Sequence, residues 1–319
     1  MLNAQLEAMM AHARAAGVPD LCELPPLAAR GLYREICAAA DLPPADVAAR
    51  DLRIPGGPAG ARHTVGLRVY TPRADGPHPV VVYFHGGGYA LGDVDAYDRV
   101  ARQLCADTQA AVVSVDYRLA PEHPYPAAFD DAWAALAWIG SAQGADTLGP
   151  SVDTQRLAVA GDSAGAVLAT VTTMLARDAG GRPRIAAQAL YYPPAAGGHP
   201  GPYPSREQHA AGPTLTRATM DYFSRYAFGP EGVAPDWRGA PLRAPSLAGL
   251  PPALLLVASH DPLRDEALAY GQALASAGTA VEAVEYHGLA HGFVSMAGAI
   301  DAARSAQRHC AMFLAQSLR

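Results

Sequence analysis

Short apolar runs alternate with helical segments over most of this 319-residue chain, and this alternation constrains the fold more than any other feature. Several runs, such as PVVVYFH at 79–85, are apolar at every residue, as expected for strands covered by helices on both faces of a parallel sheet. Strands that alternate with helices connect by right-handed crossovers, so the pattern predicts an α/β fold with a mostly parallel, doubly wound sheet. The predicted strands are 66–72, 79–85, 111–117, 156–161, 186–193, 252–259 and 280–287. The predicted helices are 95–108, 126–142, 164–178, 265–277 and 300–317.

Two segments interrupt this alternation. Residues 1–50 are alanine-rich and helical in pattern, and they begin with a short amphipathic helix. Residues 194–240 are rich in proline, glycine and aromatic residues. Insertions in such sheets lie at the carboxyl ends of strands, where ligands bind, so we expect 194–240 to form a lid over a pocket.

Charge and composition exclude several classes of protein. The net charge is −6 and no run of Lys and Arg is present, which argues against a nucleic-acid partner. The four cysteines lack CxxC spacing and indicate neither a zinc knuckle nor a redox pair. The first residues lack the basic and apolar regions of a signal peptide, and no apolar stretch reaches the roughly 18 residues of a membrane span. We therefore expect a cytoplasmic protein without stable membrane anchoring.

The segment LAVAGDSAGAVLA at 157–169 places Ser163 between a predicted strand and a predicted helix. Gly161 and Gly165 allow a tight, strained turn that would lift the serine above the sheet as a nucleophile. The alternative is structural, because Ser and Asp are also common helix caps.

A nucleophilic serine needs a base, and in this architecture the order along the chain is Ser, then Asp or Glu, then His. Three histidines follow the acids of SHDPLRDE at 259–266. His309 lies in the terminal helix and His287 ends a predicted strand, whereas His291 lies in the loop GLAHGF beside a flexible glycine. His291 is therefore the preferred base, with His287 as the alternative. The HGLAH spacing does not indicate a zinc helix, because it lacks the glutamate and contains a glycine.

Three acids compete to orient that histidine. Asp261 directly follows the strand ALLLVAS at the carboxyl edge of the sheet, from which a side chain can reach a neighbouring loop. Asp265 and Glu266 lie in the first turn of the next helix, where acids complement the helix dipole. Asp261 is therefore the preferred acid.

The segment YFHGGGYALGD at 83–93 offers backbone donors for an oxyanion. A dinucleotide-binding GxGxxG loop starting at Gly86 would need glycine at position 91, which is leucine. An HGGG loop instead supplies N–H groups that act together with the N–H after the serine, which here belongs to Ala164.

Five motifs in this order resemble the bacterial hormone-sensitive-lipase-like esterases, the family IV esterases and lipases of the α/β-hydrolase fold. They are HGGGY at 85–89, DYRLAPEHPYPAA at 116–128, GDSAG at 161–165, DPLRDE at 261–266 and HGF at 291–293. The resemblance implies Ser163 as nucleophile, His291 as base and Asp261 as acid, with Gly87, Gly88 and Ala164 as the oxyanion hole.

The resemblance also implies a domain organisation and an activity. A helical cap would be formed by 1–50 and 194–240, over a core of 51–193 and 241–319. The implied activity is hydrolysis of short- to medium-chain acyl esters, with no cofactor. The alternatives are cleavage of amides, lactones or carbamates by the same machinery, or a non-catalytic receptor, because plant gibberellin receptors resemble this family but lack the histidine. Related enzymes are often dimers, so a homodimer is compatible with the resemblance.

A few further residues carry expectations. Tyr89, Tyr97 and Tyr192 are candidate lining residues of the pocket. His260 and His287 are unusual for the family and are candidates to tune the acid and base. Arg118 and Glu122 are expected to form a structural ion pair that braces their loop.

Overall fold

In the computed structural model, which describes residues 1–57 and 63–319, eight strands form a single sheet in the order β1-β2-β4-β3-β5-β6-β7-β8. At one edge, β1 pairs antiparallel with β2, and β2 pairs antiparallel with β4. All other neighbouring strands in this order are parallel. This is the predicted α/β-hydrolase architecture with a mostly parallel sheet. The strands are β1 (Ala48–Pro55), β2 (Thr64–Thr71), β3 (His78–Phe84), β4 (Ala111–Asp116), β5 (Val152–Asp162), β6 (Ile185–Tyr191), β7 (Ala253–His260) and β8 (Val281–Ala290).

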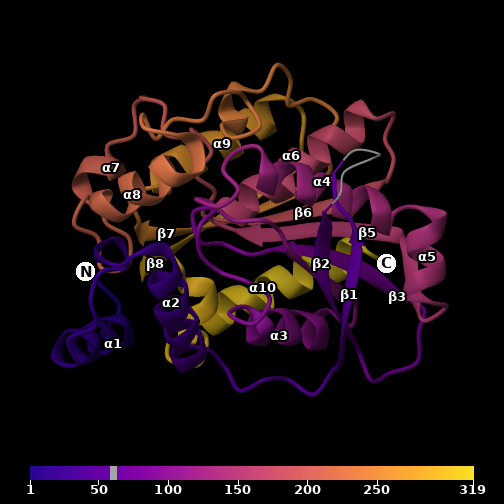
Figure 1. Cartoon of the computed structure of the whole chain (residues 1–319), viewed down its shortest axis with the longest axis horizontal. Coiled ribbons are helices and arrows are strands. Elements are labelled where there is room, and N and C mark those ends of the chain that lie inside the picture. The colour runs from indigo at the N-terminus through magenta and orange to yellow at the C-terminus, as the bar shows by residue number, and fades with distance from the viewer. Residues whose placement is uncertain (58–62) are drawn as a thin grey trace.

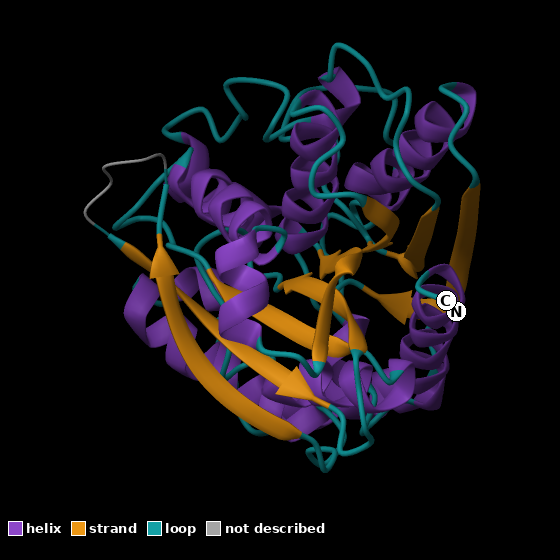
Figure 2. Cartoon of the chain, turned by 90° about the vertical axis from the view of Figure 1, so that its right-hand side faces the viewer, coloured by secondary structure: helices purple, strands orange, loops and turns teal. Residues whose placement is uncertain are grey.

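Helices cover both faces of the sheet (Figures 1 and 2). One face carries α4 (Ala127–Ile139), α6 (Ala164–Asp178) and α9 (Arg264–Ser276), and the other carries α3 (Asp98–Thr108) and α10 (Asp301–Ser317). Strand β3 shows why its sequence is apolar throughout, because alternate residues enter two different cores. Val82 packs in the core under α4 and α6, whereas Val81 packs in the core under α3 and α10. Four shorter helices lie elsewhere in the described chain: η1 (Leu21–Glu23), α5 (Ala142–Leu148), η2 (Pro241–Arg243) and η3 (Phe293–Met296).

Two segments distant in sequence gather beyond the carboxyl ends of the parallel strands. The N-terminal segment contributes α1 (Ala4–Ala15) and α2 (Pro26–Ala40), and the insertion contributes α7 (Ser205–Gln208) and α8 (Arg217–Phe228). In Figure 1 the arrows of β6 and β7 point toward these helices. The two segments touch, because the Tyr222 hydroxyl donates a hydrogen bond to the Leu24 carbonyl over 2.8 Å.

One strand differs from the sequence expectation. Residues 1–50 were expected to be helical, but β1 begins at Ala48 and forms the edge of the sheet. Its sequence AARDLRIP exposes most side chains and buries only Ile54 fully. Such an edge strand carries too few apolar residues for a period-two pattern to be visible. Among the residues that the structure describes, no helix is both long and apolar enough to cross a membrane.

A buried carboxylate ends helix α2. Asp41 is only 7% exposed, and its Oδ1 accepts a hydrogen bond from the Leu42 N–H over 2.7 Å. Burial disfavours the charged form and raises the pKa of Asp41 to about 6. The folded protein therefore holds this proton more tightly than the unfolded chain does, and stability falls as the pH rises from the ordinary value of 3.8 through about 6.

We predict that Asp41→Asn raises the free energy of unfolding near neutral pH but leaves it little changed at about pH 3. Asparagine keeps the acceptor oxygen and removes the ionisation, which costs up to about 3 kcal/mol above both pKa values. Urea unfolding at a series of pH values measures the difference. Asp46→Asn, at a side chain that is 85% exposed, is the control for loss of charge. A difference between Asp41→Asn and the wild type that is constant with pH would contradict this explanation.

Candidate active site

Ser163 lies at a sharp turn between the end of β5 and the start of α6. Its φ of 52° and ψ of −122° are strained for a residue with a side chain. Gly161 and Gly165 are needed beside this turn because neither position has room for a Cβ atom. A Cβ atom on Gly165 would lie 2.0 Å from the Phe84 carbonyl oxygen, and one on Gly161 would lie 2.4 Å from the Gly165 carbonyl oxygen. Ser163 precedes α6 without forming a side-chain capping hydrogen bond, so the helix-cap alternative is not what its hydroxyl does.

The Ser163 hydroxyl is hydrogen-bonded to a histidine from a distant part of the chain. His291 directly follows β8, and its Nε2 lies 2.9 Å from the Ser163 Oγ. Its Nδ1 lies 2.8 Å from the Oδ2 of Asp261, which directly follows β7. Asp261 is fully buried, and the His291 side chain is 11% exposed. The structure therefore brings together the three side chains that the sequence selected, at the carboxyl edge of the sheet.

Hydrogen bonds within the chain hold the loops that carry His291 and Asp261. The Thr214 hydroxyl of the insertion donates to the His291 carbonyl over 2.7 Å. The Leu263 N–H donates to Asp261 Oδ1 over 2.8 Å, which leaves Oδ2 for the imidazole. With Nδ1 donating to the carboxylate, Nε2 is free to accept the hydroxyl proton of Ser163.

Other histidines lie away from Ser163. The His287 side chain is 87% exposed inside β8 and lies 3.7 Å from Glu285. His309 pairs with Glu282 over 2.7 Å. His260 ends β7 and its Nδ1 is 2.9 Å from the neighbouring Ser259 hydroxyl, so it touches neither the base nor the acid in the hydrogen bonds of the described residues.

The glycine-rich loop after β3 lies beside the serine turn and adopts conformations that favour glycine. Gly87 has a φ of 117° and Gly88 a φ of 61°. The Leu91 N–H donates to the Gly87 carbonyl over 2.8 Å, and a Cβ atom on Gly87 would lie 2.3 Å from the Leu91 carbonyl oxygen. Gly87 and Gly88 remain partly exposed, whereas Ala164 is buried. The two glycines therefore lie at a partly exposed position of the loop.

His85 supports this loop from below. Burial lowers the pKa of His85 to about 4, so the ring is neutral near neutral pH. Its Nδ1 lies 2.8 Å from the Gly86 carbonyl, to which it donates, and the ring stacks on Tyr117 with centroids 4.2 Å apart. The Tyr117 hydroxyl donates to the His85 carbonyl over 2.7 Å. The loop is thus fixed at its start by side chains that do not face solvent.

The candidate pocket tyrosines lie mostly beneath the site. Tyr97 is 1% exposed and Tyr192 is 0% exposed, so neither presents an open surface. The Tyr192 ring packs against His291 with centroids 4.4 Å apart, and its hydroxyl accepts from the Val294 N–H over 3.3 Å. Tyr89 is 7% exposed and packs on Phe129. Periodicity could not reveal this, because whether a tyrosine lines a pocket or underlies it depends on the packing of distant segments.

Two charged residues have partners other than those expected. Arg118 does not pair with Glu122: its Nε lies 2.8 Å from Asp131 Oδ2. Glu122 instead pairs with Arg30 of α2, whose Nη2 lies 2.6 Å from Glu122 Oε2. The loop is braced by ion pairs, as predicted, but the partners are in α4, which follows it in the chain, and in the N-terminal segment, 92 residues before Glu122.

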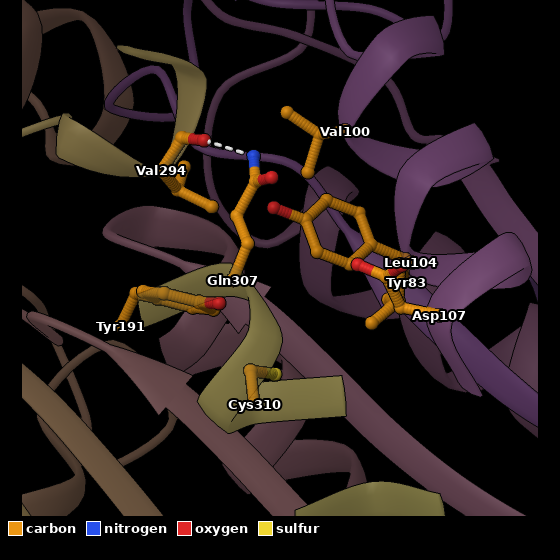
Figure 3. A pocket seen from close by; sticks show the side chains of 8 residues that line it. All are labelled: Tyr83, Val100, Leu104, Asp107, Tyr191, Val294, Gln307 and Cys310. Carbon is orange, nitrogen blue, oxygen red and sulfur yellow. Dashed lines mark hydrogen bonds between the residues drawn. The ribbon is translucent and has the colours of Figure 1, made fainter. Parts of the chain in front are cut away.

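A small void lies behind the site, between β3, β6, α3 and α10 (Figure 3). The Gln307 amide nitrogen donates to the Val294 carbonyl over 2.6 Å, and its oxygen has no hydrogen-bond partner among the described residues. The lining residues are Tyr83, Val100, Leu104, Asp107, Tyr191, Val294, Gln307 and Cys310. None of them is in the Ser163 turn or the glycine-rich loop. Within the described chain, no group of three or more His, Cys, Asp or Glu side chains is placed to hold a metal ion.

The sheet, the strained serine turn and the Ser–His–Asp contact define a serine hydrolase of the α/β-hydrolase fold. A family model described as alpha/beta hydrolase fold matches residues 81–295. Esterase LipI of Mycobacterium tuberculosis is 46% identical over 257 residues, which cover 78% of this chain and 76% of that protein. Ethyl acetate hydrolase of Pseudomonas putida is 36% identical, with 76% and 75% covered.

Solved structures agree with these relatives. A hyperthermophilic esterase from the archaeon Pyrobaculum calidifontis has a TM-score of 0.89 at 36% identity, with 99% of this chain and 98% of that chain covered. A thermostable esterase from Pseudomonas putida has a TM-score of 0.90 at 31% identity, with 100% and 98% covered. The chain belongs to the hormone-sensitive-lipase-like esterases of the α/β-hydrolase fold, and it is a carboxylic ester hydrolase.

The packing at Gly165 yields a test of the serine turn. We predict that Gly165→Ala destabilises the protein by about 3 kcal/mol, because the new Cβ meets backbone oxygens that cannot move aside. Urea unfolding measures the loss. Gly31→Ala is the matched control, because a Cβ there meets nothing within 4 Å in helix α2, and it should stabilise by about 0.5–1 kcal/mol. Unfolding of Gly165→Ala at the wild-type urea concentration would contradict the packing argument.

Proposed function

We propose that Ser163 is the nucleophile of this ester hydrolase, His291 its general base and Asp261 the acid that orients the base. The observation that carries the proposal is the hydrogen-bonded chain from Ser163 through His291 to Asp261, with contacts of 2.9 and 2.8 Å. A serine hydroxyl becomes nucleophilic when a neighbouring base removes its proton, and a buried carboxylate on the far ring nitrogen stabilises the imidazolium that results.

The mechanism follows from this geometry. Ser163 Oγ attacks the ester carbonyl while His291 Nε2 takes its proton, and the imidazolium then donates that proton to the departing alkoxide. Water repeats the cycle on the acyl-enzyme, with His291 again as base. We assign the backbone N–H groups of Gly87, Gly88 and Ala164 to the oxyanion, where each such donor can contribute roughly 3 to 4 kcal/mol to the barrier.

We further propose that the cap limits the acyl chain to short and medium lengths. Residues 1–50 and 194–240 would form the cap over a core of 51–193 and 241–319. Support comes from the contact between α8 of the insertion and the glycine-rich loop. A Cβ atom on Gly88 would lie 3.1 Å from the Cβ of Phe223 in α8, so the cap would rest directly on the oxyanion loop. A related protein is named ethyl acetate hydrolase, which is a short-chain activity.

Amide, lactone or carbamate cleavage by the same residues is the second candidate activity. A substrate panel with kcat/KM for each class separates it from ester hydrolysis. A non-catalytic receptor is disfavoured because His291 is present and in contact with Ser163. A homodimer and a cytoplasmic location stay predictions, for which sedimentation and cell fractionation are the tests.

Substitutions within the hydrogen-bonded chain test the proposed roles. We predict that Ser163→Ala lowers kcat for p-nitrophenyl butyrate by roughly 10⁶-fold, and that Asp261→Asn lowers it by roughly 10⁴-fold by favouring the wrong tautomer of His291. A fluorophosphonate probe should label Ser163 in the wild type. His287→Gln is the matched histidine control, and it should keep activity because its side chain is 87% exposed. Wild-type activity in Ser163→Ala would refute the assignment.

The chain-length proposal predicts the outcome of an ester series. The value of kcat/KM for p-nitrophenyl esters should be highest between acetate and octanoate and at least about tenfold lower for palmitate, because the cap restricts space above Gly88. Initial rates over the series measure this. Rising kcat/KM up to palmitate would contradict a restricting cap while leaving the proposed residue roles intact.

A further inference from the structure

The residue before the nucleophile carries a carboxylate that the proposed mechanism does not use. Asp162 is 2% exposed, and burial raises its pKa to about 6, although its hydrogen bonds oppose that shift. Tyr83 donates to its Oδ1 and Tyr97 donates to its Oδ2, each over 2.9 Å. Gly86 of the glycine-rich loop packs against the same carboxylate. The Asp162 carboxylate therefore contacts Tyr83 of β3, Tyr97 just before α3, and Gly86 of the glycine-rich loop.

The contact with the glycine-rich loop is very close. A Cβ atom on Gly86 would lie 2.2 Å from Asp162 Oδ2 and 2.9 Å from the Tyr97 hydroxyl oxygen. Gly86 thus has no side chain because the carboxylate and the phenol occupy that space. Since Asp162 is covalently next to Ser163, and Gly86 is next to Gly87, this contact sets how the oxyanion donors lie relative to the nucleophile.

The hydrogen-bond chain continues into the N-terminal segment. The hydroxyl oxygens of Tyr33, on α2, and Tyr97 are 2.8 Å apart. Because the Tyr97 proton is directed to Asp162, Tyr33 donates to Tyr97. Helix α2 also bonds the glycine-rich loop directly, because Arg30 donates to the Ala90 carbonyl over 2.8 Å. The same guanidinium donates to the Ala120 carbonyl, in the loop after β4, over 2.8 Å. The N-terminal segment therefore contacts the glycine-rich loop directly through Arg30 and indirectly through Tyr33, Tyr97 and Asp162.

We propose that Tyr97 and Tyr33 are positioning residues for the hydrolysis: through Asp162 they hold the Gly86–Gly88 loop at the distance from Ser163 that the oxyanion requires. This inference rests on the proposed function. Glycines at positive φ give the loop little stiffness of its own, so its position must come from contacts outside it. Oxyanion donors act only when they are placed in advance, and displacements near 1 Å can cost about 10²-fold in rate.

A purely structural role for these tyrosines makes a different prediction. Loss of a buried phenol hydroxyl would then lower stability without a specific effect on turnover. Tyr270 provides the matched control, since it is 0% exposed and its hydroxyl is 2.6 Å from Thr170, in the core under α9 and away from Asp162. Tyr270→Phe should lower the melting temperature and keep kcat.

The test compares Tyr97→Phe, Tyr33→Phe, the double variant and Tyr270→Phe in the full chain. The measurements are kcat and KM for p-nitrophenyl butyrate, the second-order rate of Ser163 labelling by a fluorophosphonate, and the melting temperature. For Tyr97→Phe we expect kcat and the labelling rate to fall roughly tenfold or more with KM within about twofold, because the lost contact acts on the transition state. For Tyr33→Phe we expect kcat to fall about threefold. The kcat of the double variant should match that of Tyr97→Phe, because the two tyrosines act in one hydrogen-bond chain.

Several results would overturn the proposal. They are full kcat in Tyr97→Phe, an equal fall in Tyr270→Phe, or losses in the two single variants that multiply in the double variant. If Tyr97→Phe does not fold, Tyr33→Phe decides alone, since its hydroxyl lies at the outer end of the chain, and full kcat in that folded variant overturns the proposal. A wild type that the probe does not label would instead refute the nucleophile assignment, so the two failures are distinguishable.

Discussion

The close approach of the β5–α6 turn to the end of β3 is the contact on which the rest of the site depends. Because Gly165 has no Cβ, the start of α6 lies against the Phe84 carbonyl, where a methyl group would be 2.0 Å from the oxygen. Phe84 ends β3, and the glycine-rich loop begins directly after it. One backbone contact therefore places the Ser163 turn beside the start of that loop.

The parallel sheet supplies the other two side chains of the site. β7 and β8 are neighbours and parallel, so Asp261 and His291 emerge side by side at the carboxyl edge. The insertion then ties both loops down. Thr214 bonds the His291 carbonyl, and the Ser205 hydroxyl donates to the Pro262 carbonyl over 2.9 Å, next to Asp261. The insertion thus contacts both the loop of His291 and the loop of Asp261.

Acids near the site are more buried than their positions in the sequence suggest. Glu266 looks like an ordinary first-turn acid of α9, yet it is 0% exposed, pairs with Arg206 of the insertion, and has its pKa raised by burial despite that partner. Asp162 is likewise buried, with tyrosine hydroxyls rather than an arginine on its two oxygens. Both carboxylates are desolvated at places where they join distant segments, Glu266 to the insertion and Asp162 to the glycine-rich loop.

Much of the fold and site could be predicted from the sequence because the signals are local. The sequence itself contains the apolar runs of strand length, the glycines on both sides of Ser163, and the order of Ser163, Asp261 and His291 along the chain. Only the tertiary structure decided which distant segments meet. It paired Glu122 with Arg30 instead of Arg118, placed Tyr97 beneath Asp162, and made an edge strand of β1, whose sequence is mostly exposed. Such pairings depend on contacts between segments tens of residues apart, for which a single sequence carries no periodic signal.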